Sequence, residues 1–218
     1  MRAAFRIGGP ALAAVLAAST AMAGGRIFID FESMETGEAP AHFTMALTGE
    51  GGPVEWVVRE DTTAPSGPKV LVETSADGEN YRFPLAILDG VEAKDVEVSV
   101  RFRPVAGRID RAAGLMVRLR DPDNYYVARA NALENNVRLY RVVNGKRHQF
   151  AGTDVPVPKD RWQLLTLRIQ GNRLSVGLDG KTLFQANDDT FPDAGRVGLW
   201  TKADSVTHFD ALTVTPLP

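Results

Sequence analysis

The amino-acid sequence predicts an all-β protein in which two sheets pack as a sandwich. Apolar and polar residues alternate along most of the chain, which is the period of a half-buried strand. Turn-forming dipeptides separate the alternating segments, and no repeat of fixed length indicates a propeller or a solenoid. Many short strands in a chain of 218 residues therefore suit two packed sheets.

The first segment has the pattern of a secretory signal peptide. Arg2 and Arg6 form a positive end, residues 7–18 are almost wholly apolar or small, and an Ala-Met-Ala run ends at Ala23. These are the features of a cleaved signal. A membrane anchor would need about 20 continuous apolar residues, and Gly-Gly-Pro at 8–10 shortens the run. We expect residues 1–23 to be removed.

The mature chain, residues 24–218, is expected to be a single domain that is periplasmic or secreted. It carries 23 Lys and Arg against 27 Asp and Glu. This balance gives no basic surface for nucleic acid and no attraction to a membrane once the signal is cleaved. The sequence has no cysteine, which excludes disulfides, thiolate zinc sites and cysteine nucleophiles.

Period-two alternation predicts a series of strands along the mature chain. No later segment keeps a helical spacing over about 12 residues, and the nearest exception is a short turn near 85–91. The predicted strands are 26–31, 54–60, 69–74, 95–103, 114–120, 125–131, 137–143, 162–170, 173–178, 181–185, 197–202 and 207–215.

Turn residues indicate how several of these strands are joined. The pairs at 144–145 (Asn-Gly), 171–172 (Gly-Asn) and 179–180 (Asp-Gly) can supply the positive φ angles of tight hairpins, whose strands run antiparallel. Asp-Pro-Asp-Asn at 121–124 is a further turn. The stretch 62–68 resembles a linker in composition, but too few residues precede it for a separate domain. We interpret it as a surface loop.

Motifs in the second half of the chain resemble one known superfamily. They are 114–127 (GLMVRLRDPDNYYV), 136–140 (NVRLY), Trp162, 178–181 (LDGK), 195–200 (GRVGLW) and 209–210 (FD). Their order resembles the concanavalin A-like lectin and glucanase superfamily, and within it the bacterial exported laminin G-like and 3-keto-disaccharide hydrolase domains. The resemblance covers about residues 95–215. It implies a jelly-roll sandwich of two curved antiparallel sheets, whose concave face holds carbohydrate in many members.

Catalytic residues are not evident in the sequence. Glycosidases of this fold generally use paired carboxylates, but the Glu-x-Asp-x-x-Glu glucanase pattern is absent. Zinc-ligand spacing, a Gly-x-Ser-x-Gly elbow and a phosphate loop are also absent. A pair from distant strands, for example Glu134 with Asp121 or Asp204, remains an alternative, so the sequence leaves open whether the chain is an enzyme.

The polar side of the central strands is the most suggestive site. Alternation puts Leu115 and Leu119 on one face of the strand 114–120 and Arg118 on the other, and the adjacent Tyr125 and Tyr126 must also point to opposite faces. An aromatic platform beside hydrogen-bond donors is what a sugar ring needs. The alternatives are that the charges only keep the sheet soluble and that the tryptophan belongs to the core. The predicted ligand-binding residues, with Asn136 beside them, are Arg118, Arg129, Asn131, Arg138, Tyr140, Trp200 and Lys202.

Calcium is the one cofactor that the resemblance suggests. Related sandwiches often hold a structural ion between an acid near the start of the chain and one in the last strand. Asp210 matches the last-strand position, and Asp30 or Glu32 would be its partner. Calcium needs six or more oxygen ligands including carbonyls, and the alternative is that these are ordinary acids at the ends of sheets.

Three functions are consistent with the sequence. The first is an exported carbohydrate-binding or glycan-associated domain that uses its polar, concave sheet face. The second, implied by the resemblance, is a glycoside hydrolase or lyase that acts on a 3-keto-disaccharide or a related sugar. The third is an envelope domain that presents a sheet face to another protein, for which an apolar patch is expected. We favour the first because the glucanase acid motif is missing.

Overall fold

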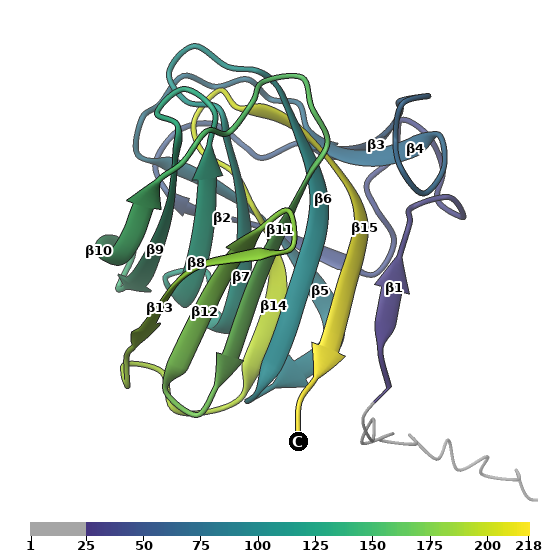
Figure 1. Ribbon diagram of the computed structural model, residues 1–218. Helices are drawn as coiled ribbons and strands as arrows, with labels where there is room; N and C mark the ends of the chain where they lie inside the picture. The colour runs from purple at the N-terminus through teal and green to yellow at the C-terminus, as the bar shows by residue number, and fades with distance from the viewer. Residues whose placement is uncertain (1–24) are drawn as a thin grey trace, which may run out of the picture.

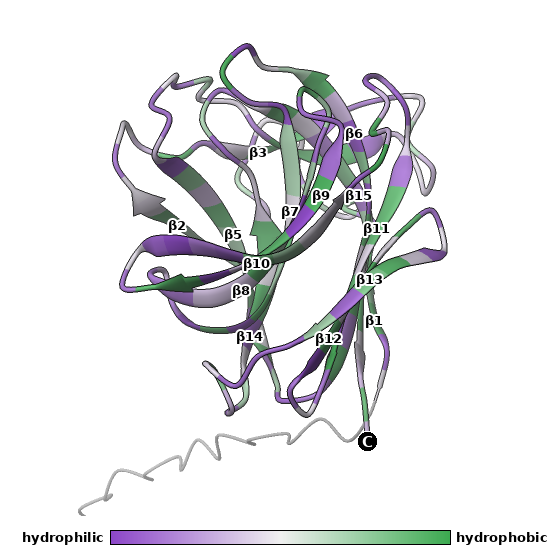
Figure 2. Ribbon diagram, turned by 60° about the vertical axis from the view of Figure 1, so that its left-hand side comes forward, coloured by the Kyte–Doolittle hydropathy of each residue, from purple (hydrophilic) through white to green (hydrophobic). Residues whose placement is uncertain are grey.

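The protein is a sandwich of two antiparallel β-sheets, as predicted (Figure 1). The structure is a computed structural model that describes residues 25–218, so the predicted signal peptide lies outside the described residues. Seen from the side, the labelled strands of one sheet lie on the left and those of the other, apart from β3, lie on the right (Figure 2). Within the described residues, no helix has the length and hydropathy needed to cross a membrane.

Sheet A contains eight strands, and the first strand of the described chain pairs with the last. From one edge to the other its strands are β13 (Lys181–Asn187), β12 (Arg173–Leu178), β11 (Gln163–Gln170), β6 (Val96–Ala106), β15 (Val206–Pro216), β4 (Lys69–Glu73) and β3 (Trp56–Glu60), and β1 (Ile27–Ile29) also pairs with β15.

Sheet B contains seven strands. In order they are β10 (Lys146–Asp154), β9 (Asn136–Val143), β8 (Asn124–Asn131), β7 (Ala112–Asp121), β14 (Gly195–Trp200), β5 (Arg82–Ala93) and β2 (Phe43–Gly49).

The predicted hairpins are confirmed. Asn144 and Gly145, with φ angles of 49° and 75°, connect β9 to β10, and Asp179 and Gly180, with φ angles of 50° and 77°, connect β12 to β13. Gly171, whose φ is 58°, begins the turn between β11 and β12. These left-handed conformations give the turn a twist that matches the strands it joins. The stretch 62–68 is a loop between β3 and β4, as expected.

The turn predicted near 85–91 is wrong, because these residues lie in β5. Every residue from Arg82 to Leu88 is buried. Ala86 and Leu88 face the space between the sheets, while Leu85 and Ile87 belong to a second apolar cluster on the other side of sheet B. A strand that is buried on both faces has no polar face, so its sequence does not alternate.

A bulge in β7 reverses the side-chain alternation that the sequence predicts. Arg118 has a φ of 49°, and the pairing of β7 with β8 shifts between Val117 and Asp121. An extra residue in a strand moves every later side chain to the opposite face. Leu115 therefore faces the inter-sheet core while Leu119 lies in the second cluster, so the predicted face assignments of Leu119 and Arg118 are wrong.

Two apolar clusters share the buried side chains. The larger fills the space between the sheets and includes Phe102, Leu167, Phe209 and Tyr126. The smaller, here called the outer cluster, lies on the face of sheet B that points away from sheet A. Its buried members are Phe83, Leu85, Ile87, Ala112, Met116, Leu119, Tyr125, Val127, Tyr140, Val142 and Trp200. The prediction that Tyr125 and Tyr126 point to opposite faces is confirmed.

Candidate functional site

The outer face of sheet B is concave. Four strands separate β10 from β5, so in a flat sheet the two would lie about 24 Å apart at the usual strand spacing. The guanidinium carbon of Arg147 in β10 is nevertheless 4.7 Å from the ring centroid of Phe83 in β5. The Tyr81 hydroxyl beside β5 also donates to the Gly145 carbonyl in the β9–β10 turn, at 2.9 Å. The sheet must curl strongly for its edge strand β10 to reach β5.

Aromatic side chains form the floor of this concavity. Phe83 and Trp200 are stacked with their centroids 5.4 Å apart, and the Trp200 Nε1 donates to the Tyr125 hydroxyl at 3.2 Å. Burial raises the pKa of Tyr125, which stays protonated. A Cβ atom at Gly114 would lie 2.9 Å from the Trp200 ring, so the indole needs a glycine beneath it. Trp200 is fully buried, as its core alternative predicted, and it supports the face from below.

Arg129, Asn136 and Glu134 form the first polar group on the concave face. The Arg129 Nη2 donates to Glu134 Oε2 and to Asn136 Oδ1, both at 2.7 Å. The Asn136 Nδ2 donates to Glu134 Oε2 at 2.9 Å. The Arg129 guanidinium also lies over the Tyr140 ring, 5.6 Å from its centroid. Burial alone would raise the pKa of Glu134, but the Asn136 hydrogen bond and the Arg129 charge lower it, so Glu134 is ionised at neutral pH.

Lys202 and Asp110 form the second polar group. The Lys202 Nζ lies 2.8 Å from Asp110 Oδ2 and 2.6 Å from Asn80 Oδ1. The Asn131 Nδ2 donates to the other Asp110 oxygen at 2.8 Å. Because Asn131 Oδ1 also accepts the Glu134 backbone N–H at 3.1 Å, Asn131 joins the two polar groups.

The structure thus gathers most of the predicted residues on one face and separates one of them. Besides those already placed, Arg138 points to the same face and pairs with Asp154. Arg118 lies apart, because the bulge in β7 turns it toward the end of the sandwich. There its guanidinium donates to the carbonyls of Lys94, Phe191 and Gly171 and to the Asp95 carboxylate. Arg118 therefore ties chain segments together and does not face the concavity.

Sequence reasoning missed Arg147, Asp110 and Asn80. Arg147 lies in β10, where polar residues occupy both faces of an edge strand and leave no alternation. Asp110 and Asn80 precede β7 and β5 in irregular segments. One signal could have located Arg147. The Asn-Gly turn predicts a hairpin, and a strand that followed this turn would have paired with β9 so that Arg147 lay opposite Val142.

The carboxylates proposed as partners for Glu134 have structural roles. Asp121 accepts hydrogen bonds from Asp123 and Asn124 within its own turn. Asp204 accepts the backbone N–H groups of residues 108–110, and although burial would raise its pKa, these bonds lower it.

The predicted calcium ligands do not make a ready site. Both Asp210 oxygens accept hydrogen bonds from Ser66, through its N–H at 2.8 Å and its hydroxyl. Asp30 accepts the Glu32 N–H at 3.1 Å, and Glu32 Oε1 accepts the Lys69 N–H at 2.7 Å. Within residues 25–218, no three His, Asp or Glu side chains converge as metal ligands. A calcium ion would have to displace donors of the chain, so these residues as arranged do not fit it and calcium stays a prediction.

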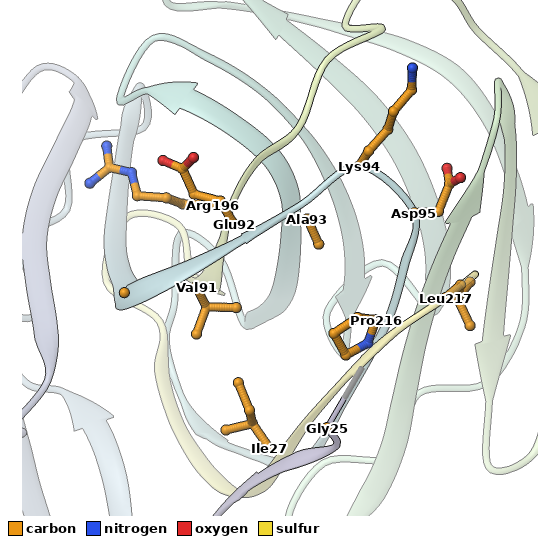
Figure 3. A pocket seen from close by; sticks show the side chains of 11 residues that line it. Gly25, Ile27, Val91, Glu92, Ala93, Lys94, Asp95, Arg196, Pro216 and Leu217 are labelled. Atoms are coloured by element: carbon orange, nitrogen blue, oxygen red, sulfur yellow. The ribbon is translucent and has the colours of Figure 1, made fainter. Parts of the chain in front are cut away.

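A pocket of about 550 Å³ lies at the end of the sandwich, away from the concave face (Figure 3). Ile27, Val91 and Leu217 give it an apolar side, and Glu92 and Arg196 lie on another side. It has no aromatic lining residue on which a sugar could stack. The polar groups described above converge instead on the concave face of sheet B, where we place the candidate site.

Comparisons with known proteins agree with this architecture. No family model and no curated protein sequence matches the chain. Among solved structures, it is similar to the carbohydrate-binding module CBM66 from Bacillus subtilis, with 21% identity and a TM-score of 0.61 over 78% of this chain and 94% of that one. It is also similar to the cellulose-induced protein Cip1, with 13% identity and a TM-score of 0.63 over 86% and 96% of the two chains.

A third similar structure is domain 4 of AbnA, a GH43 extracellular arabinanase from Geobacillus stearothermophilus, in complex with arabinotriose. It has 16% identity and a TM-score of 0.55 over 87% of this chain and 90% of that one. Likenesses at these identities establish the fold. The chain has the jelly-roll sandwich fold that the resemblance of its motifs implied.

Proposed function

We propose that this protein is a carbohydrate-binding domain that works outside the cytoplasm and binds sugar on the concave face of sheet B. The observation that carries the proposal is the convergence of Arg129, Asn136, Arg138 and Lys202 on one curved face beside Tyr140. Donor side chains that are held in place by their neighbours match the hydroxyl groups of a pyranose or furanose, while the buried Tyr140 ring supports the Arg129 guanidinium. The similarity to a carbohydrate-binding module supports the same assignment.

Binding without turnover is favoured by the state of Glu134. A glycosidase needs a protonated carboxyl group as its general acid. The lowered pKa of Glu134 and its 2.7 Å contact with Arg129 keep this carboxylate ionised. Its geometry therefore suits an acceptor for sugar hydroxyls.

A glycan panel tests the proposal. We expect the purified protein to bind one class of oligosaccharide without releasing product, with Arg138→Ala weakening binding about tenfold through the loss of a charge-assisted hydrogen bond. The matched control is Arg168→Ala, because Arg168 lies on the outer face of sheet A and also pairs with an acid, Glu97. The proposal is wrong if no sugar binds, if both substitutions weaken binding equally, or if product accumulates.

A further inference from the structure

Arg147 differs from the other cations on the concave face in having no partner of opposite charge. Arg129 pairs with Glu134, Arg138 with Asp154 and Lys202 with Asp110. Among residues 25–218, the Arg147 side chain forms neither an ion pair nor a hydrogen bond, and its Nη1 is sealed from solvent without an acceptor. The face therefore carries one uncompensated positive charge at its centre.

Aromatic rings hold the Arg147 guanidinium in place. Its central carbon lies 4.6 Å from the Tyr140 centroid, 4.7 Å from that of Phe83 and 5.7 Å from that of Trp200. Stacking of this kind fixes the plane of a guanidinium and removes part of its hydration. Burial lowers the pKa of Arg147, as expected for a cation that has lost water and gained no full counter-charge.

The free edge of this guanidinium has the geometry of an anion receptor. Nε and Nη2 also have no protein partner, but unlike Nη1 they are not sealed from solvent. A guanidinium presents such a pair of N–H groups in parallel, and a carboxylate accepts them as a two-point contact. The rings that hold the guanidinium leave that edge pre-oriented, so little side-chain entropy is lost on binding.

We infer that the concave face recognises an acidic sugar, a uronic acid whose carboxylate pairs with the Nε and Nη2 edge of Arg147. This inference rests on the proposed function and names the ligand class of the same site. A single unpaired guanidinium matches a single planar carboxylate. The neighbouring Arg129 and Lys202 are buried and already paired with acids, so Arg147 is the cation of this face that is left to pair with an anion.

The test compares each acidic sugar with its uncharged ester. Calorimetric titrations use oligogalacturonide and oligoglucuronide, their methyl esters, a sulfated oligosaccharide and neutral arabino- and cello-oligosaccharides. We expect the wild-type protein to bind one acidic form about tenfold or more tightly than its ester, the worth of a two-point charged contact. Arg147→Gln should remove that preference, Arg147→Lys should keep only part of it, and Arg173→Gln, which removes an exposed arginine of sheet A, should leave it unchanged.

Each contrary result has a distinct meaning. Equal affinity for acid and ester overturns the uronic-acid inference but leaves the carbohydrate-binding proposal intact. Tighter binding of the sulfated sugar overturns the choice of a carboxylate. Binding of no sugar, acidic or neutral, overturns both proposals. The comparison of acid with ester in the wild-type protein needs no variant, so it decides the matter even if Arg147→Gln fails to fold.

Discussion

The outer faces of the two sheets differ in how deeply their side chains are buried. In β6 and β11 of sheet A, buried and partly exposed positions alternate, whereas nearly every position of β7 and β8 in sheet B is buried. Sheet A thus shows the ordinary pattern of a sheet with one solvated face. Sheet B curls, which buries most of its outer face. The polar side chains on that face form hydrogen bonds and ion pairs with one another. This difference indicates that the outer face of sheet B, and not that of sheet A, holds its polar side chains in fixed positions.

The largest test of this difference compares two tryptophans. Trp200 is fully buried in the outer cluster, while Trp162 lies partly exposed on sheet A beneath Arg103. Trp200→Ala should lower the free energy of unfolding by about 3–5 kcal/mol, and Trp162→Ala by about 1 kcal/mol. Denaturant unfolding measures both. Equal losses would mean that the outer cluster is not a second core.

The bulge in β7 offers the next test. Arg118→Ala should cost about 3 kcal/mol of unfolding free energy, because it leaves Asp95 and several buried carbonyls without their donor. Arg120, two residues further along, is exposed, and its replacement by alanine should change stability by no more than about 0.5 kcal/mol. Similar values for both variants would show that Arg118 does not tie the end of the sandwich together.

An ion pair on each outer face sharpens the comparison further. Arg129 is buried against Glu134, whereas Arg168 and Glu97 are each 41% exposed. We expect Arg129→Ala to lower the free energy of unfolding by about 1–3 kcal/mol and Arg168→Ala by no more than about 0.5 kcal/mol. Thermal unfolding of the two variants and the wild type shows which substitution lowers stability more. A reversed order would mean that the concave face is no better organised than the outer face of sheet A.

The smallest expected effect is a pH dependence of stability that arises from a histidine in sheet A. Burial lowers the pKa of His208 below its ordinary value of 6.5, although the adjacent Asp61 raises it and Arg103 lowers it further. The unfolded chain then binds the proton more readily than the folded protein. Stability should therefore fall as the pH drops below about 6.5 and should level off below the folded pKa.

Substitution of the histidine tests this sign. Unfolding measured at about pH 7.5 and about pH 5.5 should show a smaller loss of stability for His208→Gln than for the wild type. His148→Gln is the control, because His148 is exposed on β10. An unchanged slope in the His208 variant would assign the dependence to other groups.

The parts of the fold that the sequence predicted are those where one face meets water. There the alternation of polarity is complete, as in β6, β11 and β12, and the hairpin dipeptides fix the connections. β5 has no alternation because both its faces are buried, and the bulge at Arg118 depends on a single backbone angle that no composition signal marks.

The residues of the candidate site likewise include some that the sequence could predict and some that it could not. Arg129, Asn131, Arg138 and Tyr140 could be assigned to one face because regular pairing of β8 with β9 preserves the period of two. Asp110 comes from a loop and is brought to Lys202 by the fold alone. Arg147 reaches the site because the sheet curls, which only the three-dimensional structure reveals.

The position of β15 constrains the order in which the chain can fold. This last strand lies inside sheet A, between β6 and β4, and it also pairs with β1 at the start of the described chain. During folding, β4 and β6 therefore each keep an unpaired edge until residues 206–216 join the sheet. Pairing between such distant segments is slow, and open strand edges associate readily with other chains. The chain is thus open to aggregation at these two edges until β15 has paired with them.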